Sequence, residues 1–242
     1  MKHVTYYIVL TAILFGCGIT DKQKTQASIS IAISVVPDIT DPRNSWPTAT
    51  KIFQQFHCKN TPDAECQFRL RTISDLRHTP VYTYTLPSST ITEKNNQDDD
   101  VQLRSKNIKA FESMITKAMR SFYAKADTTK SLPSSECLWT IADELSILAK
   151  SSCDQKVLII ASDLIEKSEI ANFYTMNLTN EAAISAVLEK SNLLPPTLAG
   201  IKIIFLFEPK SREEDIVFSH IVEAYKNALI ARGGEVSVQA NL

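Results

Sequence analysis

The chain has 242 residues, enough for one domain of ordinary size with short extensions. Its formal net charge is −1, from 26 Lys and Arg against 27 Asp and Glu, so it carries no basic field that would recruit nucleic acid. It contains only 5 glycines, and none of Gly200, Gly233 and Gly234 stands in the glycine-rich motif that a P-loop or a dinucleotide-binding loop requires.

The N-terminus resembles the leader of a bacterial lipoprotein. Lys2 and His3 precede an apolar run over residues 4–15, which is short for a transmembrane helix and typical of a signal-peptide core. The run ends in Leu14-Phe15-Gly16-Cys17, which resembles the lipobox, with an apolar residue three places before the cysteine and a small residue just before it. The resemblance implies cleavage before Cys17 and acylation of that cysteine, for example with palmitate. The alternative is an ordinary secretory leader with an incidental cysteine.

The predicted organisation therefore has three parts. Residues 1–16 form the signal peptide, residues 17–27 form the lipidated cysteine and a polar tether, and residues 28–242 form the folded domain. Several acyl chains hold a protein stably at a membrane surface without spanning it. We therefore expect the protein in the bacterial cell envelope, at the outer membrane or cell surface rather than the inner membrane.

Strand and helix patterns alternate along the domain. Strands are expected at 28–36, 67–73, 81–86, 156–162, 201–207 and 235–239, and helices at 46–56, 98–123, 136–150, 177–191 and 212–232. The second and third strands form a hairpin. This order predicts a three-layer, Rossmann-like α/β fold, with a mostly parallel sheet, one antiparallel edge strand and helices on both faces.

Oxygen-bearing side chains follow two of the predicted strands. Asp38 and Thr40 come directly after the first strand, and Asp163 follows the fourth. In α/β sheets, ligands bind just beyond the carboxyl ends of the parallel strands. These side chains therefore occupy the expected position of a binding site.

This order, with acidic tips on the first and fourth strands, resembles a von Willebrand factor type A domain over about residues 29–239. In that family an Asp-x-Ser-x-Ser motif, a loop threonine and a later aspartate form a metal-ion-dependent adhesion site for magnesium or a similar ion. Such hard cations prefer carboxylate, hydroxyl and water oxygens. The resemblance implies Asp38, Thr40 and Asp163 as metal ligands, with Ser134 or Ser135 in place of the loop threonine.

The motif is degenerate, because Pro42 occupies the position of the second serine and has no ligand atom. Two outcomes stay open on the sequence alone. Either a divalent cation such as magnesium binds weakly at Asp38 and Asp163, or the site has lost its ion and the two carboxylates are solvated or cap neighbouring loops.

Four cysteines remain beside Cys17, which permits two disulfides in an exported protein and three possible pairings. Cys58 and Cys66 flank the short link between the first helix and the second strand, so we expect these two to be bonded. Cys137 and Cys153 bracket a helix of about 15 residues, which separates them by roughly 20 Å. That is too far for a bond if the helix is straight, and the sequence alone leaves open whether both thiols stay reduced and packed.

These features favour a non-enzymatic binding module, anchored to the membrane by lipid, that engages a protein partner through the loops around Asp38, Ser135 and Asp163. No Gly-x-Ser-x-Gly or His-Glu-x-x-His motif occurs. Two alternatives remain: a metal-dependent hydrolase or phosphoryl-transfer enzyme that uses Asp38, and a structural component of an envelope assembly.

Overall fold

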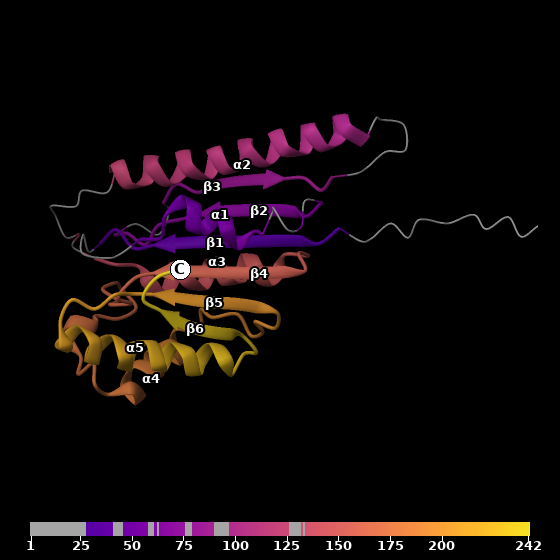
Figure 1. The fold of residues 1–242 in the computed structure, drawn as a ribbon. Coiled ribbons are helices and arrows are strands. Elements are labelled where there is room, and N and C mark those ends of the chain that lie inside the picture. The colour runs from indigo at the N-terminus through magenta and orange to yellow at the C-terminus, as the bar shows by residue number, and fades with distance from the viewer. Residues whose placement is uncertain are drawn as a thin grey trace, which may run out of the picture.

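The computed structural model describes residues 28–40, 46–57, 61, 63–75, 79–89, 97–125, 132 and 134–242 (Figure 1). The strands are β1 (Ser30–Pro37), β2 (Glu65–Leu70), β3 (Tyr82–Leu86), β4 (Gln155–Ala161), β5 (Ile201–Leu206) and β6 (Glu235–Gln239). The helices are α1 (Ala49–Gln55), α2 (Gln97–Lys125), α3 (Cys137–Lys150), α4 (Glu181–Ser191) and α5 (Arg212–Ile230), with a short 3-10 helix at Phe173–Thr175.

The six strands form one sheet in the order β3-β2-β1-β4-β5-β6. All neighbouring pairs are parallel except β2 and β3, which form the antiparallel hairpin. Figure 1 shows β3 at one edge, running against the other five strands. The predicted fold class is confirmed, because the sheet is mostly parallel, has one antiparallel edge strand and alternates with helices along the chain. The order is that of a Rossmann-like sheet.

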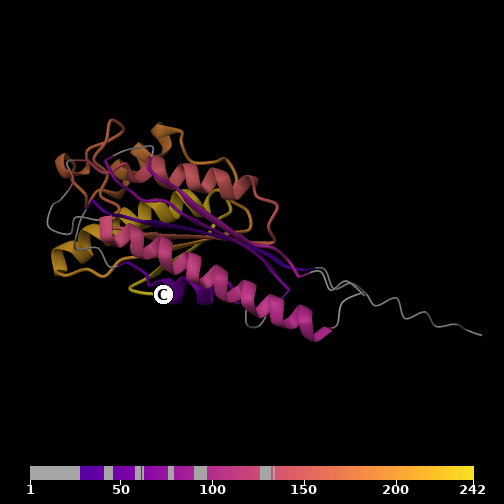
Figure 2. The ribbon, with the colours of Figure 1, turned by 90° about the horizontal axis from the view of Figure 1, so that it is seen from above.

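Helices cover both faces of the sheet and bury a core on each. Apolar residues of α1 and α2 pack on one face, and those of α3, α4 and α5 pack on the other. Figure 2 shows α1 and α2 on one side of the strands and α3 on the opposite side. Both faces of β1 are therefore buried, as is usual for a central parallel strand. Ile31, Ile33 and Val35 face α1 and α2, while Ala32 and Val36 face α3.

Buried polar side chains fix α3 on the sheet. The Ser34 hydroxyl of β1 donates to Glu144 Oε2 at 2.8 Å, and Arg69 Nε of β2 donates to the same oxygen at 2.7 Å. Arg71 contacts both Asp143 and Glu144 of α3. Because α3 begins at the carboxyl edge of the sheet, these contacts also fix its first residues there.

Two helices begin later than the apolar periodicity predicts. α1 begins three residues later, with Thr48 as N-cap, whose hydroxyl accepts from the Lys51 amide at 3.3 Å. α4 begins four residues later, with Asn180 as N-cap, whose side chain accepts from the Ala183 amide at 3.2 Å. In both cases the capping side chain sets the helix start.

In the part of the chain that the structure describes, no helix combines the length and the apolar character that crossing a bilayer requires. The predicted signal peptide, Cys17 and the tether lie outside the described residues.

Candidate functional site

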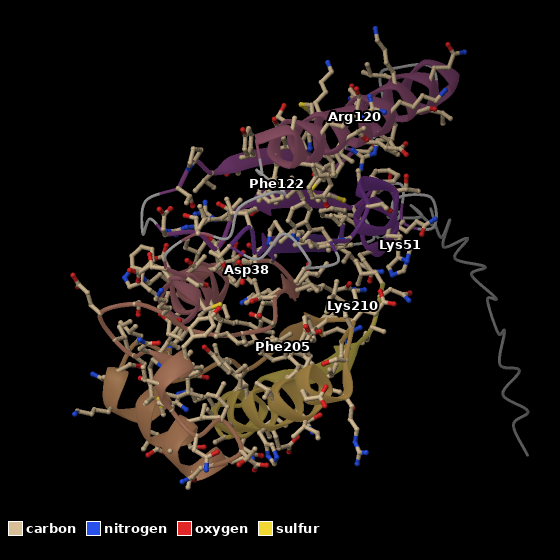
Figure 3. The ribbon with its side chains drawn as sticks, turned by 90° about the vertical axis from the view of Figure 1, so that its left-hand side faces the viewer. Asp38, Lys51, Arg120, Phe122, Phe205 and Lys210 are labelled. Carbon is tan, nitrogen blue, oxygen red and sulfur yellow. The ribbon has the colours of Figure 1, made fainter. Side chains whose placement is uncertain are left out.

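The carboxyl ends of β1 and β4 meet at the centre of one sheet edge. The two strands are neighbours, with Pro37 opposite Ala161, and the Asp38 amide donates to the Ala161 carbonyl at 2.8 Å. From this point the strand order runs to β2 and β3 on one side and to β5 and β6 on the other. Such a switch in strand order is where α/β sheets bind ligands. Figure 3 looks onto this edge, with Asp38 near its middle.

The Asp38 carboxylate is fully buried and accepts hydrogen bonds from Thr40 and Ser162. Its Oδ1 accepts from the Thr40 amide at 2.8 Å and from the Thr40 hydroxyl at 2.7 Å. Its Oδ2 accepts from the Ser162 hydroxyl, at the end of β4, at 2.6 Å. The Ser162 oxygen in turn accepts from the Leu164 amide at 2.9 Å. We call Asp38, Thr40 and Ser162 the strand-end network, since together they tie the end of β1 to the end of β4.

Ser135 and Cys137 adjoin the strand-end network from the start of α3. The Ser135 hydroxyl donates to Cys137 Sγ at 3.7 Å, and that sulfur lies 3.5 Å from Ser162 Oγ and 3.9 Å from Asp38 Oδ2. Burial, and then the negative charges of Asp38 and Glu166, raise the pKa of Cys137 well above its ordinary value. Cys137 therefore stays a thiol, which is the form that packs and donates weakly and not the nucleophilic thiolate.

Sequence reasoning missed Ser162 and Cys137. Ser162 is adjacent to Asp163, which the resemblance had favoured as the acidic ligand. Cys137 had been weighed only as a disulfide partner. Cys137 and Cys153 are both reduced and buried in the structure. Cys58 lies outside the described residues, so its bond to Cys66 stays a prediction.

Asp163 is half-buried, and its contacts differ from those of Asp38. Its Oδ1 accepts from the Ile165 amide at 3.0 Å, which shapes the loop after β4. Its side chain also lines a cavity beside the start of α5. The side-chain hydrogen bond between the two strand ends is thus supplied by Ser162, and Asp163 lines the cavity.

Glu166 is a second buried carboxylate near the strand-end network. Its Oε2 accepts from the Leu138 amide in the first turn of α3 at 2.7 Å, where the N-cap residue Glu136 makes no capping bond of its own. Burial raises the pKa of Glu166 to about 7, and the hydrogen bonds from Ser168 and Leu138 only partly oppose this rise. The side chain is therefore half-protonated near neutral pH, although it serves a helix N-terminus that favours negative charge.

The residue types at the strand-end network suit a hard cation, but their arrangement does not. Both oxygens of Asp38 are already engaged by donors of the chain, and the side chain has no exposed surface. Among the described residues, no three His, Cys, Asp or Glu side chains are grouped so that they could hold a metal ion. Pro42 lies outside the described residues. As folded, the network does not fit a preformed magnesium site.

The cavity beside Asp163 has a volume of about 250 Å³. Its apolar floor comes from the loop after β4, the end of β5 and the first turns of α5, namely Ile165, Leu178, Phe207, Val217 and Phe218. Its rim is charged and consists of Asp163, Glu208, Lys210, Glu213 and Glu214. In Figure 3 Lys210 lies on the α5 side of Asp38. An apolar hollow with a few polar groups at its rim, at the carboxyl edge of an α/β sheet, is a typical binding site.

No protein-family model matches the chain, and no curated protein matches it. Several solved structures are similar to the chain, among them the following two. The SpRpn10 VWA domain is 12% identical, with a TM-score of 0.32 over 86% of this chain and 87% of that chain. An aerotolerance-related membrane protein from Bacteroides fragilis NCTC 9343, with multiple mutations to serines, is 8% identical, with a TM-score of 0.30 over 86% of this chain and 92% of that chain. At these TM-scores neither similarity supports a conclusion about function, and the fold class rests on the strand order and layers described above.

Proposed function

We propose that the protein is a lipid-anchored module of the bacterial cell envelope that binds a protein partner through the loops at the carboxyl edge of its sheet, without enzymatic activity. The observation that supports this proposal best is the cavity beside Asp163. It has a volume of about 250 Å³, an apolar floor and a charged rim. It suits one or two apolar side chains, which is how a protein partner anchors itself in a pocket.

The direction of β1 supports the same arrangement. Ser30 begins β1 at the amino edge, and Asp38 follows the strand at the carboxyl edge. Eight residues of strand place the two edges about 25 Å apart. A lipid on Cys17 with a tether over residues 17–27 would enter at the amino edge. The cavity, at the carboxyl edge, would then face away from the membrane.

The chemistry at the centre of the edge favours binding over catalysis. Asp38 is buried and hydrogen-bonded, so it is not presented to a substrate, and burial keeps Cys137 as a thiol. We propose that the strand-end network of Asp38, Thr40 and Ser162 holds the loops in place and does not serve as a magnesium site.

Recovery of a partner from native envelopes tests the proposal. The full chain, with an affinity tag, is purified from gently solubilised envelopes as wild type, as Val217→Lys in the cavity floor, and as Lys202→Glu at the amino edge. We expect one protein to co-purify with wild type and Lys202→Glu and to be lost with Val217→Lys. Equal recovery with all three forms would contradict binding at the carboxyl edge.

Substitution of Cys17 tests the proposed lipid anchor. Cys17→Ser should yield a protein without acyl label that leaves the detergent phase, because the substitution removes the atom to which the acyl chains attach. A Cys17→Ser variant that keeps both its label and its detergent partitioning would refute lipidation at that residue.

A further inference from the structure

We propose that Glu166 is a proton-dependent latch: its protonated side chain keeps the loop after β4 closed on the start of α3, and loss of the proton lets the two separate. The cavity beside Asp163 is built partly from that loop, so the latch would control the shape of the cavity. The opening of the loop goes beyond the proposed function, whereas its consequence for a partner rests on that function.

Glu166 connects the loop after β4 to the start of α3 in the interior of the protein. The residue is fully buried, and its Oε2 accepts from the Leu138 amide at 2.7 Å. Beside it, the Ser135 amide donates to the Lys167 carbonyl at 2.9 Å, and the Lys167 amide donates to the Ser135 carbonyl at 3.1 Å. Opening of the loop would therefore break a small and identifiable set of contacts.

One residue of the loop has an unfavourable backbone conformation. Leu164, two residues before Glu166, has a φ of 63°, in the left-handed region that residues with a side chain rarely adopt. Its side chain is fully buried, and its amide donates to Ser162 Oγ at 2.9 Å. Such a conformation persists only where the surrounding contacts fix it. Loss of the contacts made by Glu166 would let Leu164 relax, which favours opening.

An ionised Glu166 is poorly compensated in the closed loop. Its second oxygen, Oε1, is buried and has no hydrogen-bond partner in the described part of the chain. The donors that favour the ionised form are the Leu138 amide and the Ser168 hydroxyl. Burial opposes that form most strongly, followed by the negative charges of Glu136 at the start of α3 and Asp38 after β1.

The other titratable neighbours of Glu166 do not supply a positive charge. Cys137 of α3 is a buried thiol, and burial, followed by nearby carboxylates including Glu166, raises its pKa. Tyr225 of α5 is fully buried, and its hydroxyl has no hydrogen-bond partner among the described residues. Lys167 is next along the loop, with its Nζ 5.9 Å from the centroid of the Tyr174 ring. Entry of water is therefore the means by which an ionised Glu166 is stabilised.

The difference between the closed and the open loop sets the pH range of the latch. Opening exposes Glu166 to water, where its pKa returns from about 7 to the ordinary 4.5. The closed loop thus binds the proton more tightly, and opening becomes more favourable as the pH rises from about 4.5 to about 7. Above this range both forms are ionised. Between about pH 5 and about pH 7.5, the open population should rise about 50-fold.

The same loop supplies part of the cavity wall. Asp163, Ile165 and Leu178 line the cavity, and Asp163 Oδ1 accepts from the Ile165 amide at 3.0 Å. These residues flank Glu166 along the chain, so opening there would displace this wall. The wall contributed by α5, with Val217 and Phe218, would remain. We therefore expect the partner to bind more tightly at mildly acidic pH.

Hydrogen exchange followed by mass spectrometry tests the latch on the purified full chain. Exchange is measured at about pH 5, 6 and 7.5, with labelling times scaled for the base-catalysed exchange of unprotected amides. The informative peptides cover residues 134–142 and 162–178, which contain the start of α3 and the loop. The reference peptide covers β5 in the core.

Two variants show whether Glu166 is the titrating group. Glu166→Gln keeps the shape of the protonated side chain and cannot ionise. Glu189→Gln makes the same change at an exposed position of α4. Thermal melting confirms that each variant is folded. Should Glu166→Gln fail to fold, the pH dependence of wild type alone still decides the outcome.

In wild type, we expect scaled exchange of both informative peptides to rise about 50-fold between about pH 5 and about pH 7.5. It should be at least about tenfold faster than in β5 at each pH, because a local opening costs less than global unfolding. Glu189→Gln should behave as wild type, and Glu166→Gln should lack the rise. Scaled exchange that is independent of pH in wild type, or the same rise in Glu166→Gln, would overturn the latch. Exchange as slow as in β5 would show that only global unfolding exposes Glu166, and would also overturn it.

Partner recovery from native envelopes separates the latch from the proposed function. We expect wild type to recover more of the partner at about pH 5.5 than at about pH 7.5, and Glu166→Gln to recover it equally at both. If exchange behaves as predicted and no partner is recovered at either pH, the latch stands and the proposed function fails. If wild type recovers the partner equally at both, the latch does not control the cavity and the inference is overturned.

Discussion

Removal of the Asp38 carboxylate tests whether the strand-end network is structural. Asp38→Ala deletes the carboxylate that accepts two hydrogen bonds from Thr40 and one from Ser162 at 2.6–2.8 Å. A hydrogen bond to a charged group contributes about 1.5–3 kcal/mol. Because Thr40 is half-exposed, water can replace the two bonds that it makes, whereas the Ser162 hydroxyl is buried and loses its acceptor.

With the space left by the carboxylate included, we expect Asp38→Ala to lower the free energy of unfolding by about 3–5 kcal/mol. Asp38→Asn keeps the shape and one carbonyl acceptor, so its cost should be about 1–2 kcal/mol. A domain has about 5–15 kcal/mol of stability in total. Asp38→Ala should therefore remain folded, with a urea midpoint lower by roughly 2 M.

Urea unfolding followed by circular dichroism measures these differences, with and without magnesium. A metal site would gain about 2.7 kcal/mol when magnesium is a hundredfold above its dissociation constant. The structural role predicts that magnesium, manganese and a chelator leave the wild-type midpoint unchanged. A loss below about 1 kcal/mol for Asp38→Ala, or a midpoint that rises with magnesium in wild type and not in Asp38→Ala, would refute this reasoning.

Three further predictions concern other side chains. The pKa of Glu166 is about 7 in the folded chain, against an ordinary value of 4.5. The folded state therefore holds a proton that the unfolded state has lost, and the free energy of unfolding should fall by about 3 kcal/mol as the pH rises from 4.5 to 7. Urea titrations at several pH values should show this fall in wild type and not in Glu166→Gln, and the same pH dependence in both proteins would contradict the prediction. Glu144→Ala leaves the Arg69 guanidinium without its carboxylate partner, so the free energy of unfolding in urea should fall by about 3–5 kcal/mol. A fall within experimental error would show that water replaces the Glu144 carboxylate at no cost. Peptide mapping without reduction should recover Cys58 and Cys66 as one linked species, and labelling of both thiols in protein purified from envelopes would refute the bond.

The fold was predictable because its signals are local and repeated. β1 places Ile31, Ile33 and Val35 on one face and small residues on the other, and the structure packs those faces against different helices. The helix starts were less predictable, because a start depends on which of several neighbouring polar side chains caps the helix. At α4 the capping residue is Asn180.

The candidate site was predictable in place but not in detail. The sequence placed Asp38 and Thr40 at the end of a central strand, and the structure shows them hydrogen-bonded there. Ser162 follows Leu158 and Ile160 at the two-residue spacing of a strand, so it falls on the face of β4 that packs with α3. The resemblance to the metal-site motif had directed attention to Asp163 instead. The cavity joins residues from 163 to 218, brought together only by packing of α5 on the sheet.

Site-specific photo-crosslinking in the cells that make the protein tests the central claim most directly. A photoreactive residue replaces Lys210 at the cavity rim or Glu235 at the amino end of β6, with or without Val217→Lys in the cavity floor. We predict one dominant protein adduct from position 210, its loss with Val217→Lys, and no matching adduct from position 235. The same adduct from both positions, or an adduct from position 210 that Val217→Lys leaves unchanged, would contradict partner binding at the carboxyl edge.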